Sequence, residues 1–217
     1  MAPSVWAVVV AGGSGARYGR QKQFDLLGGR PVVEWAVAGA RNVAEGVVVV
    51  VPHERAGGGE LFGADVAVAG GTSRSASVRR GLDAVPATAD VVVVHDAARP
   101  LAAAGLFGAV VAALEVPGVD GAVCALALSD TVKRVEPDGT VAATLDRSSL
   151  VAVQTPQAFR AGVLRSAHAG GGEATDDAAL LEELGSVVRV VPGDPRNIKV
   201  TTPDDLAYCE HVLVTGR

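Results

Sequence analysis

Short apolar runs rich in valine alternate along the sequence with segments whose apolar residues recur at helical spacing. Continuous β-branched runs are typical of strands covered on both faces, and their alternation with helices predicts parallel strands joined by right-handed crossovers. The predicted strands are residues 5–11, 46–52, 65–70, 90–97, 121–128 and 187–193, and the predicted helices are residues 31–41, 73–85, 103–116, 175–184 and 203–213. We therefore predict an α/β fold built on a doubly wound, mostly parallel sheet.

The segment from Ser129 to Ser149 departs from this alternation. Apolar and polar residues alternate on either side of the sequence EPDGT, which has the turn residues of a hairpin. The segment carries too little apolar surface for a central strand, so we predict a protruding β-hairpin arm at residues 129–149. Such an arm needs a surface to pack against, and a second subunit is the expected one.

Length and composition narrow the class of protein. A chain of 217 residues with 49% hydrophobic content can bury one sizeable core, so a single domain over residues 1–217 is expected. The formal net charge of −5 argues against a general basic face for nucleic acid or an anionic membrane. The sequence has no long apolar run and no signal-like leader, and Cys124 and Cys209 lie in apolar runs without a CxxC spacing. We expect a cytoplasmic protein with two buried free thiols, no membrane span and no nucleic-acid partner.

The glycine cluster after the first apolar run is a candidate phosphate-binding loop. It does not match the dinucleotide pattern GxGxxG, because Tyr18 occupies the third glycine position, and it contains no Walker A sequence. Backbone amides could still form an anion nest, to which Arg17 and Lys22 would add positive charge. The amides in question belong to Gly12, Gly13, Ser14 and Gly15. An ordinary glycine-rich turn with solvated arginines is the alternative.

A second candidate segment, HDAARP, follows the valine run at residues 91–94. Asp96 emerges at the carboxyl end of the predicted strand, where a carboxylate can hold Mg²⁺ against phosphate oxygens. Arg99 follows closely enough to bind a phosphate with its guanidinium fork. In the alternative interpretation, Asp96 caps the following helix. We interpret His95 as structural, because no partner nucleophile is visible.

A third candidate segment, GGTSRSASVRRGL, begins at Gly70. Thr72 and Ser73 after two glycines form a good helix start by themselves. Beside a nucleotide, the close backbone and the hydroxyl of Ser77 could also read a base edge through hydrogen bonds.

Two further segments have helix-start residues. In NIKVTTPDDL, Thr202 and Asp205 are predicted to form a capping box, and Lys199 is placed in a short strand before it. Thr175 in TDDAALLEEL is first an N-cap residue, and a ligand contact only secondarily.

Together these segments resemble the 2-C-methyl-D-erythritol 4-phosphate cytidylyltransferases of the non-mevalonate isoprenoid pathway. The similarity runs in order through AGGSGARYGRQKQF, GGTSRSASVRRGL, HDAARP, DTVKR, LDRSSL, QTPQAF, TDD and NIKVTTPDDL. It implies a Rossmann-like fold that transfers CMP from CTP to 2-C-methyl-D-erythritol 4-phosphate, with Mg²⁺ or another divalent cation as cofactor. Because the chain ends soon after VLVTGR, no fused cyclodiphosphate synthase domain is expected.

The resemblance also implies roles for individual residues. Arg17 and Lys22 act on the triphosphate and, with Arg147 and Lys199, make up the implied catalytic set; Asp96 is the metal-side carboxylate. The implied CTP-binding residues are Ala11, Gly12, Gly13, Ser14, Gly15, Gly71, Thr72, Ser77, Asp96 and Ala97. The implied residues around the methylerythritol phosphate are Arg99, Thr131, Arg147, Thr155, Thr175 and Lys199. Thr131 and Arg147 lie on the arm and enter the neighbouring subunit's site in this family, which implies a homodimer.

Other functions stay open at this point. A ribitol-5-phosphate cytidylyltransferase would share the fold and the nucleotide chemistry, although HDAARP and the pair Thr131 and Arg147 favour methylerythritol phosphate. The missing third glycine disfavours a Rossmann oxidoreductase, and the set of phosphate-binding cations disfavours a noncatalytic nucleotide-binding module.

Overall fold

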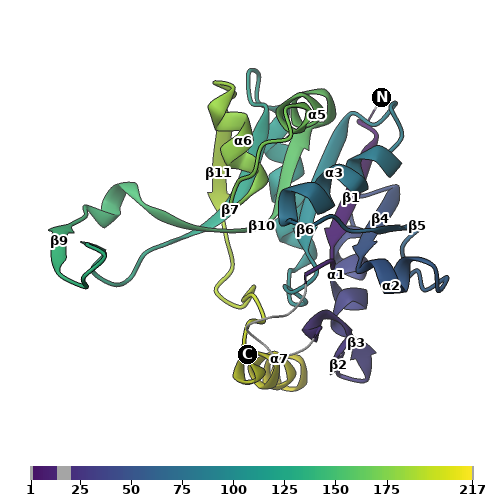
Figure 1. Ribbon diagram of the computed structural model, residues 1–217, viewed down its shortest axis with the longest axis horizontal. Helices are drawn as coiled ribbons and strands as arrows, with labels where there is room; N and C mark the ends of the chain where they lie inside the picture. Colours follow the sequence, from purple (N-terminus) through teal and green to yellow (C-terminus); the bar gives the residue numbers. More distant parts are fainter. Residues whose placement is uncertain (1, 14–20, 217) are drawn as a thin grey trace.

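The computed structural model describes residues 2–13 and 21–216, and these form a seven-stranded sheet between two layers of helices (Figure 1). The order across the sheet is β11-β7-β10-β6-β1-β4-β5. The strands are β1 (Val5–Val10), β4 (Gly46–Val51), β5 (Val66–Ala69), β6 (Val91–Asp96), β7 (Gly121–Ala127), β10 (Val151–Arg160) and β11 (Val188–Pro192). Every pairing in this sheet is parallel except the two that β10 makes with β6 and β7. The predicted doubly wound, mostly parallel sheet is confirmed.

Alternate residues of the central strands face two separate hydrophobic clusters, as the pleat of a strand requires. Ala7 and Val9 of β1 join the cluster that α1 and α4 cover, whereas Val8 joins the cluster that α3, α5 and α6 cover. The helices are α1 (Val32–Ala40), α2 (His53–Ala56), α3 (Arg74–Ala84), α4 (Ala104–Ala112), α5 (Ala161–Ala169), α6 (Asp177–Glu183) and α7 (Pro203–Thr215). Burial on both faces explains why the strands appear in the sequence as continuous valine runs.

The chain reverses its direction of travel across the sheet between β1 and β6. From β1 it proceeds outward to β4 and β5, and it then returns to place β6 on the other side of β1. In open α/β sheets such a reversal leaves a crevice at the carboxyl ends of the two strands, and this is the usual ligand position. Here those ends are Val10 and Asp96, which are paired in register.

The predicted arm is present as a two-stranded antiparallel sheet, β8 (Lys133–Val135) and β9 (Val141–Thr144), joined through the turn at Gly139. Figure 1 shows it projecting from the body of the molecule. Val135 and Val141 pair with each other and are 58% and 61% exposed in the single chain. Both side chains therefore present apolar surface to solvent in the single chain.

Smaller elements complete the fold. A two-stranded sheet of β2 (Leu26–Leu27) and β3 (Arg30–Pro31) packs with α7 around Leu27 and Cys209. Short 3₁₀ turns occupy Lys22–Phe24, Ala113–Glu115 and Arg147–Ser149. Both cysteines are buried and free, as predicted. Within the described ranges, no helix is both long enough and apolar enough to span a bilayer.

The sequence prediction did not include the short elements α2, β2 and β3, and it also missed two longer ones. Strand β10 and helix α5 follow one another along the chain, and neither was expected. Three polar residues of β10 are nevertheless buried, namely Gln154, Thr155 and Gln157. A strand that buries polar side chains lacks the apolar pattern that identified the other strands.

Candidate active site

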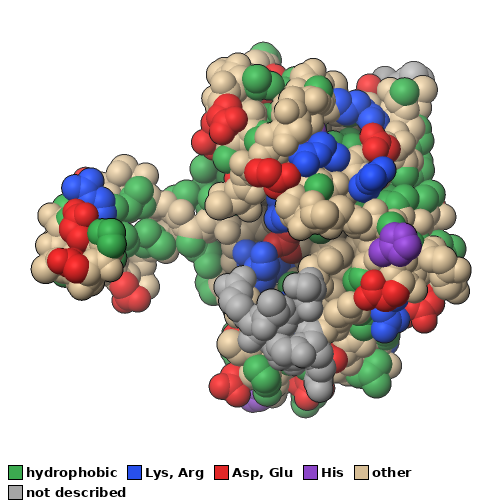
Figure 2. Space-filling model, viewed as in Figure 1, with side chains coloured by type: hydrophobic (Ala, Val, Ile, Leu, Met, Phe, Trp, Pro, Cys, Tyr) green, Lys and Arg blue, Asp and Glu red, His purple; other side chains and the backbone are tan. Residues whose placement is uncertain are grey.

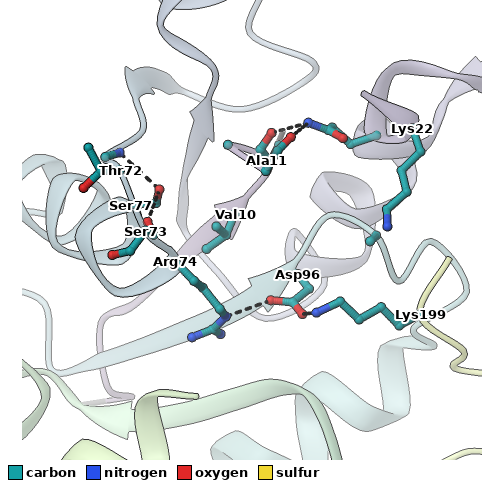
Figure 3. Close-up of a pocket in the computed structure, with 14 residues that line it drawn as sticks. Val10, Ala11, Lys22, Thr72, Ser73, Arg74, Ser77, Asp96 and Lys199 are labelled. Carbon is teal, nitrogen blue, oxygen red and sulfur yellow. Dashed lines mark hydrogen bonds and ion pairs between the residues drawn. The ribbon is translucent and has the colours of Figure 1, made fainter. Parts of the chain in front are cut away.

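A cavity of about 510 Å³ lies at the carboxyl ends of β1 and β6 and is closed on one side by the start of α3 (Figure 3). It brings together residues that are far apart in the sequence, as the predicted crevice at the end of a parallel sheet requires. The predicted residues that line it are Ala11, Gly12, Gly13, Lys22, Gly71, Thr72, Ser77, Asp96 and Lys199. Figure 2 shows basic and acidic side chains meeting in the middle of this face.

Not all of the predicted site residues are found among the described lining residues. Ser14, Gly15 and Arg17 fall outside the described residues. Ala97 is fully buried, and the adjacent Ala98 lines the cavity in its place. Thr131 and Arg147 are exposed on the arm, where the Arg147 guanidinium donates to the Ser129 carbonyl. Within one chain, the arm residues are therefore separate from the cavity lining.

The predicted N-cap at Thr175 is wrong. Helix α6 begins at Asp177, and the side chain of Asp176 caps it by accepting a hydrogen bond from the Ala179 amide. Thr175 precedes this cap in an exposed segment. Asp176 was overlooked because the sequence TDD offers three adjacent residues that can each cap a helix.

The glycine loop is held from behind by Gln23, a residue that sequence reasoning missed. The buried Gln23 amide donates to the Ala11 carbonyl at 2.7 Å and to the Gly13 carbonyl at 2.8 Å. Gln23 belongs to the same 3₁₀ turn as Lys22, so both carbonyls are bound by the turn that carries this lysine. The contact fixes the start of the loop relative to Lys22.

With CTP, the substrate that the resemblance implies, we expect Gln23→Met to raise the KM about tenfold. The change keeps the side-chain length but removes both donors, so two loop carbonyls lose their partners. Initial rates over a range of CTP concentrations measure the effect. Gln21→Met is the matched control, since among the described residues the Gln21 amide donates to the exposed Glu54 carboxylate and not to the Ala11 or Gly13 carbonyl. An unchanged KM in the Gln23 variant would show that the loop does not depend on this contact.

The start of α3 forms a second backbone loop facing the glycine loop. Ser73 caps the helix, as predicted, by accepting from the Ala76 amide at 3.0 Å. The Ser77 hydroxyl accepts from the Gly71 amide at 3.1 Å and donates to the Ser73 carbonyl at 2.8 Å. A Cβ on Gly71 would lie 2.5 Å from the Ala76 side chain, so only glycine fits there.

Asp96 carries positive partners on both carboxylate oxygens. Lys199 Nζ lies 2.6 Å from Oδ2, and Arg74 Nε lies 3.3 Å from Oδ1 (Figure 3). Burial alone would raise the pKa of Asp96, but Arg74 and Lys199 outweigh it and hold that pKa well below its usual range. Asp96 is therefore ionised at neutral pH, and it tethers a lysine whose side chain is 41% exposed.

Lys199 lies in an irregular segment, so the predicted short strand around it is wrong. The segment is held by Asn197, which is fully buried and donates to the Thr155 carbonyl at 2.9 Å. Arg99 donates to the Asn197 carbonyl at 2.7 Å, and Gln154 donates to the same oxygen at 3.2 Å. Side-chain hydrogen bonds thus replace the ladder of a strand and connect Lys199 to β10.

His95 is structural in this arrangement, as predicted. Its ring accepts from the Thr155 hydroxyl at Nδ1 and donates from Nε2 to the Arg99 carbonyl, in the tautomer that satisfies both contacts. Burial lowers the pKa of His95 to about 4, so the ring is neutral at pH 7. The Thr155 hydroxyl also accepts from the Asp96 amide at 3.0 Å. Thr155 therefore positions Asp96 from below the cavity floor.

The donor set fits a magnesium ion shared with a ligand. In the part of the chain that the structure describes, no three His, Cys, Asp or Glu side chains gather closely enough to hold a metal by themselves. Asp96 offers one carboxylate with lone pairs beyond those that its two cationic partners use. One carboxylate completed by phosphate oxygens is a common Mg²⁺ environment.

Comparison with known proteins identifies a family model and named relatives that match almost the whole chain. The family model for 2-C-methyl-D-erythritol 4-phosphate cytidylyltransferase (IspD) matches residues 5–215. A protein from Nocardia farcinica named as that cytidylyltransferase is 45% identical, over 97% of this chain and 94% of its own length. A bifunctional IspD/IspF enzyme from Anaeromyxobacter dehalogenans is 46% identical over 98% of this chain. The chain spans 58% of that relative's length, a little over half.

Solved structures agree with these matches. The 2-C-methyl-D-erythritol 4-phosphate cytidylyltransferase of Thermus thermophilus superposes with a TM-score of 0.81 at 36% identity, covering 99% of this chain and all of the other. The 4-diphosphocytidyl-2C-methyl-D-erythritol synthase of Anaerococcus prevotii superposes with a TM-score of 0.84 at 28% identity, covering 98% and 99%.

Proposed function

The chain belongs to the 2-C-methyl-D-erythritol 4-phosphate cytidylyltransferase family, and on that premise we propose that it transfers CMP from CTP to 2-C-methyl-D-erythritol 4-phosphate. The products are 4-diphosphocytidyl-2-C-methyl-D-erythritol and pyrophosphate. The observation that carries the proposal is the cavity between β1, β6 and α3, where Lys22, Lys199 and Asp96 face two glycine-containing loops.

The reaction makes and breaks one bond at phosphorus. An oxygen of the acceptor phosphate attacks the α-phosphorus of CTP, and the bond from that phosphorus to the bridging oxygen of the pyrophosphate breaks. CTP carries about four negative charges at pH 7 and the acceptor close to two, so the two anions repel strongly. The protein must position both and neutralise their charge, and it needs no covalent nucleophile.

The described residues divide this work between two sides of the cavity. The loops at Ala11–Gly13 and Gly71–Thr72 support the nucleoside and the triphosphate, with Lys22 on the phosphate side. Lys199, which Asp96 holds at the cavity, serves the acceptor phosphate. Arg99 is proposed to act with it, since its guanidinium is bound to the Asn197 carbonyl two residues before Lys199. Arg17 is proposed to act with Lys22 on the triphosphate.

Asp96 would hold Mg²⁺ together with phosphate oxygens of CTP. When bound, the ion supplies neutralisation of the charge that develops on pyrophosphate. Asp96 is ionised and lies at the edge of the cavity, which supports this role. The lysine tethered to Asp96 is partly exposed and has room to transfer from the carboxylate to a phosphate.

We propose that the arm completes the site of a second copy of the chain. Thr131 and Arg147 flank strands β8 and β9, which form the projecting arm in Figure 1, and neither residue is part of the described cavity lining. Exposed apolar side chains on and beside the arm offer the contact surface, namely Val135, Val141, Val151 and Val153. The two free buried thiols support the further proposal of a reducing, cytoplasmic compartment.

Release of pyrophosphate from CTP tests the proposed function. We expect release with 2-C-methyl-D-erythritol 4-phosphate and Mg²⁺, and loss of release in EDTA. With ribitol 5-phosphate we expect kcat/KM to be at least about a hundredfold lower, because the wrong acceptor leaves hydrogen-bonding groups of the site unpaired. Efficient turnover of ribitol 5-phosphate would show instead that the protein is a ribitol-5-phosphate cytidylyltransferase. Absence of release with either acceptor would overturn both.

A further inference from the structure

Arg74 lies between two carboxylates that belong to different elements. It is the first residue of α3, and its Nε is 3.3 Å from Asp96 on β6. Its NH1 is 2.8 Å from Asp177, the first residue of α6. The side chain is largely buried, with 22% of its surface exposed. One guanidinium therefore joins the floor of the cavity to the start of α6.

The Asp177 end of this link is fully enclosed. The Asp177 side chain has no exposed surface, and its second oxygen lies 3.0 Å from His168 Nε2 on α5. A buried carboxylate is tolerated only where cationic or hydrogen-bonding partners compensate it. We refer to Arg74, Asp96, Asp177 and His168 as the Arg74 clamp.

Helix α3 also holds the segment that leads into α6. Arg79 donates to the Gly172 carbonyl and to the Glu173 carboxylate, both at 2.9 Å. The Ser75 hydroxyl accepts from the Ala174 amide at 3.3 Å. Residues 172–177 are therefore fixed to the same helix whose first turn closes the cavity.

We propose that Arg74 is a positioning residue for the transfer reaction. By fixing one oxygen of Asp96, it sets the orientation of the carboxylate and hence the place of Lys199, which binds the other oxygen. Through its contact with Asp177, Arg74 also keeps Asp96 and Lys199 at a constant distance from the segment that precedes α6. The clamp thus aligns the acceptor phosphate with the α-phosphorus of CTP. This inference rests on the proposed function.

A purely structural role makes a different prediction. If Arg74 served only to neutralise Asp177, removing both charges would restore folding and activity together, because neutral replacements leave no uncompensated buried charge. If Arg74 orients Asp96, removing both charges would restore folding but leave Oδ1 of Asp96 without its cationic partner, while Lys199 still binds Oδ2. Stability and turnover then separate in the double variant.

The test compares Arg74→Gln, Asp177→Asn and the double variant. We expect each single change to lower the Tm and the double variant to regain most of the loss. We expect kcat to fall about 30-fold or more in Arg74→Gln and in the double variant, with the KM for CTP within about threefold of wild type, because alignment acts on the transition state. Asp177→Asn should lose less kcat, since Arg74 still reaches Asp96.

Arg165→Gln is the matched control. The Arg165 guanidinium also joins two helices, but it donates to carbonyls of Leu82, Val85 and Pro86 at the far end of α3. Its loss should lower the Tm and leave kcat within about twofold. Wild-type kcat in the double variant would overturn the role of Arg74, as would wild-type kcat in Arg74→Gln. An inactive wild type would instead overturn the proposed function, so the two failures are distinguishable.

Discussion

Replacing Lys199 with methionine is expected to lower kcat about 150- to 900-fold, because one preorganised charge at a transferring phosphoryl group is worth roughly 3–4 kcal/mol in the transition state. Methionine keeps most of the side-chain volume and removes only the ammonium. Lys199 is the partner of Asp96 at 2.6 Å and lines the cavity, so its loss removes positive charge where the two anions meet. Steady-state rates of pyrophosphate release measure the change.

The fold should survive this substitution. Arg74 still pairs with Asp96 in the variant, so the buried carboxylate is not left alone. Arg189→Met on strand β11 is the matched control, because Arg189 is exposed on an edge strand away from the cavity. It should leave kcat unchanged. A folded Lys199→Met enzyme with kcat within about tenfold of wild type would show that the lysine does not stabilise the transition state.

The valine-rich strands and the arm were predictable because each has a pattern with one physical cause. Burial on both faces produces the uninterrupted runs of β1, β4 and β6. Strand β10 was missed for the opposite reason. It buries Gln154 and Thr155 to hold the 193–200 segment and Asp96, so the residues that serve the site remove the apolar pattern of a strand.

The residues of the candidate site were predictable where they lie next to an element that the local sequence identifies. The glycines, Lys22 and Asp96 lie at or after the carboxyl ends of predicted strands, and the rule that ligands bind at those ends is enough to place them together. Arg74 and Gln23 could not be found in this way. The partner carboxylate of Arg74 lies 22 residues away, and Gln23 binds backbone carbonyls that carry no sequence signal. Tertiary contacts alone define such supporting residues.

The arm gives the second large expected effect, a recovery of activity on mixing two inactive variants. Arg147→Ala removes the guanidinium from the arm, and Lys199→Met removes the ammonium from the body of the chain. Each variant alone should lose activity in both sites of a homodimer. If the arm serves the neighbouring subunit, one site of the mixed dimer combines an intact body with an intact arm, and the other site carries both changes.

Random exchange of equal amounts makes half of the dimers mixed, so about a quarter of the wild-type activity per site should return. The measurement needs subunit exchange confirmed by native mass spectrometry, with each variant exchanged against itself as the control. No recovery after confirmed exchange would place Arg147 in the site of its own chain. Such a result would contradict the proposed role of the arm, which projects from the body of its own chain (Figure 1). The arm would then have to fold back over its own body, and Val135 and Val141, now exposed, would be buried against their own chain.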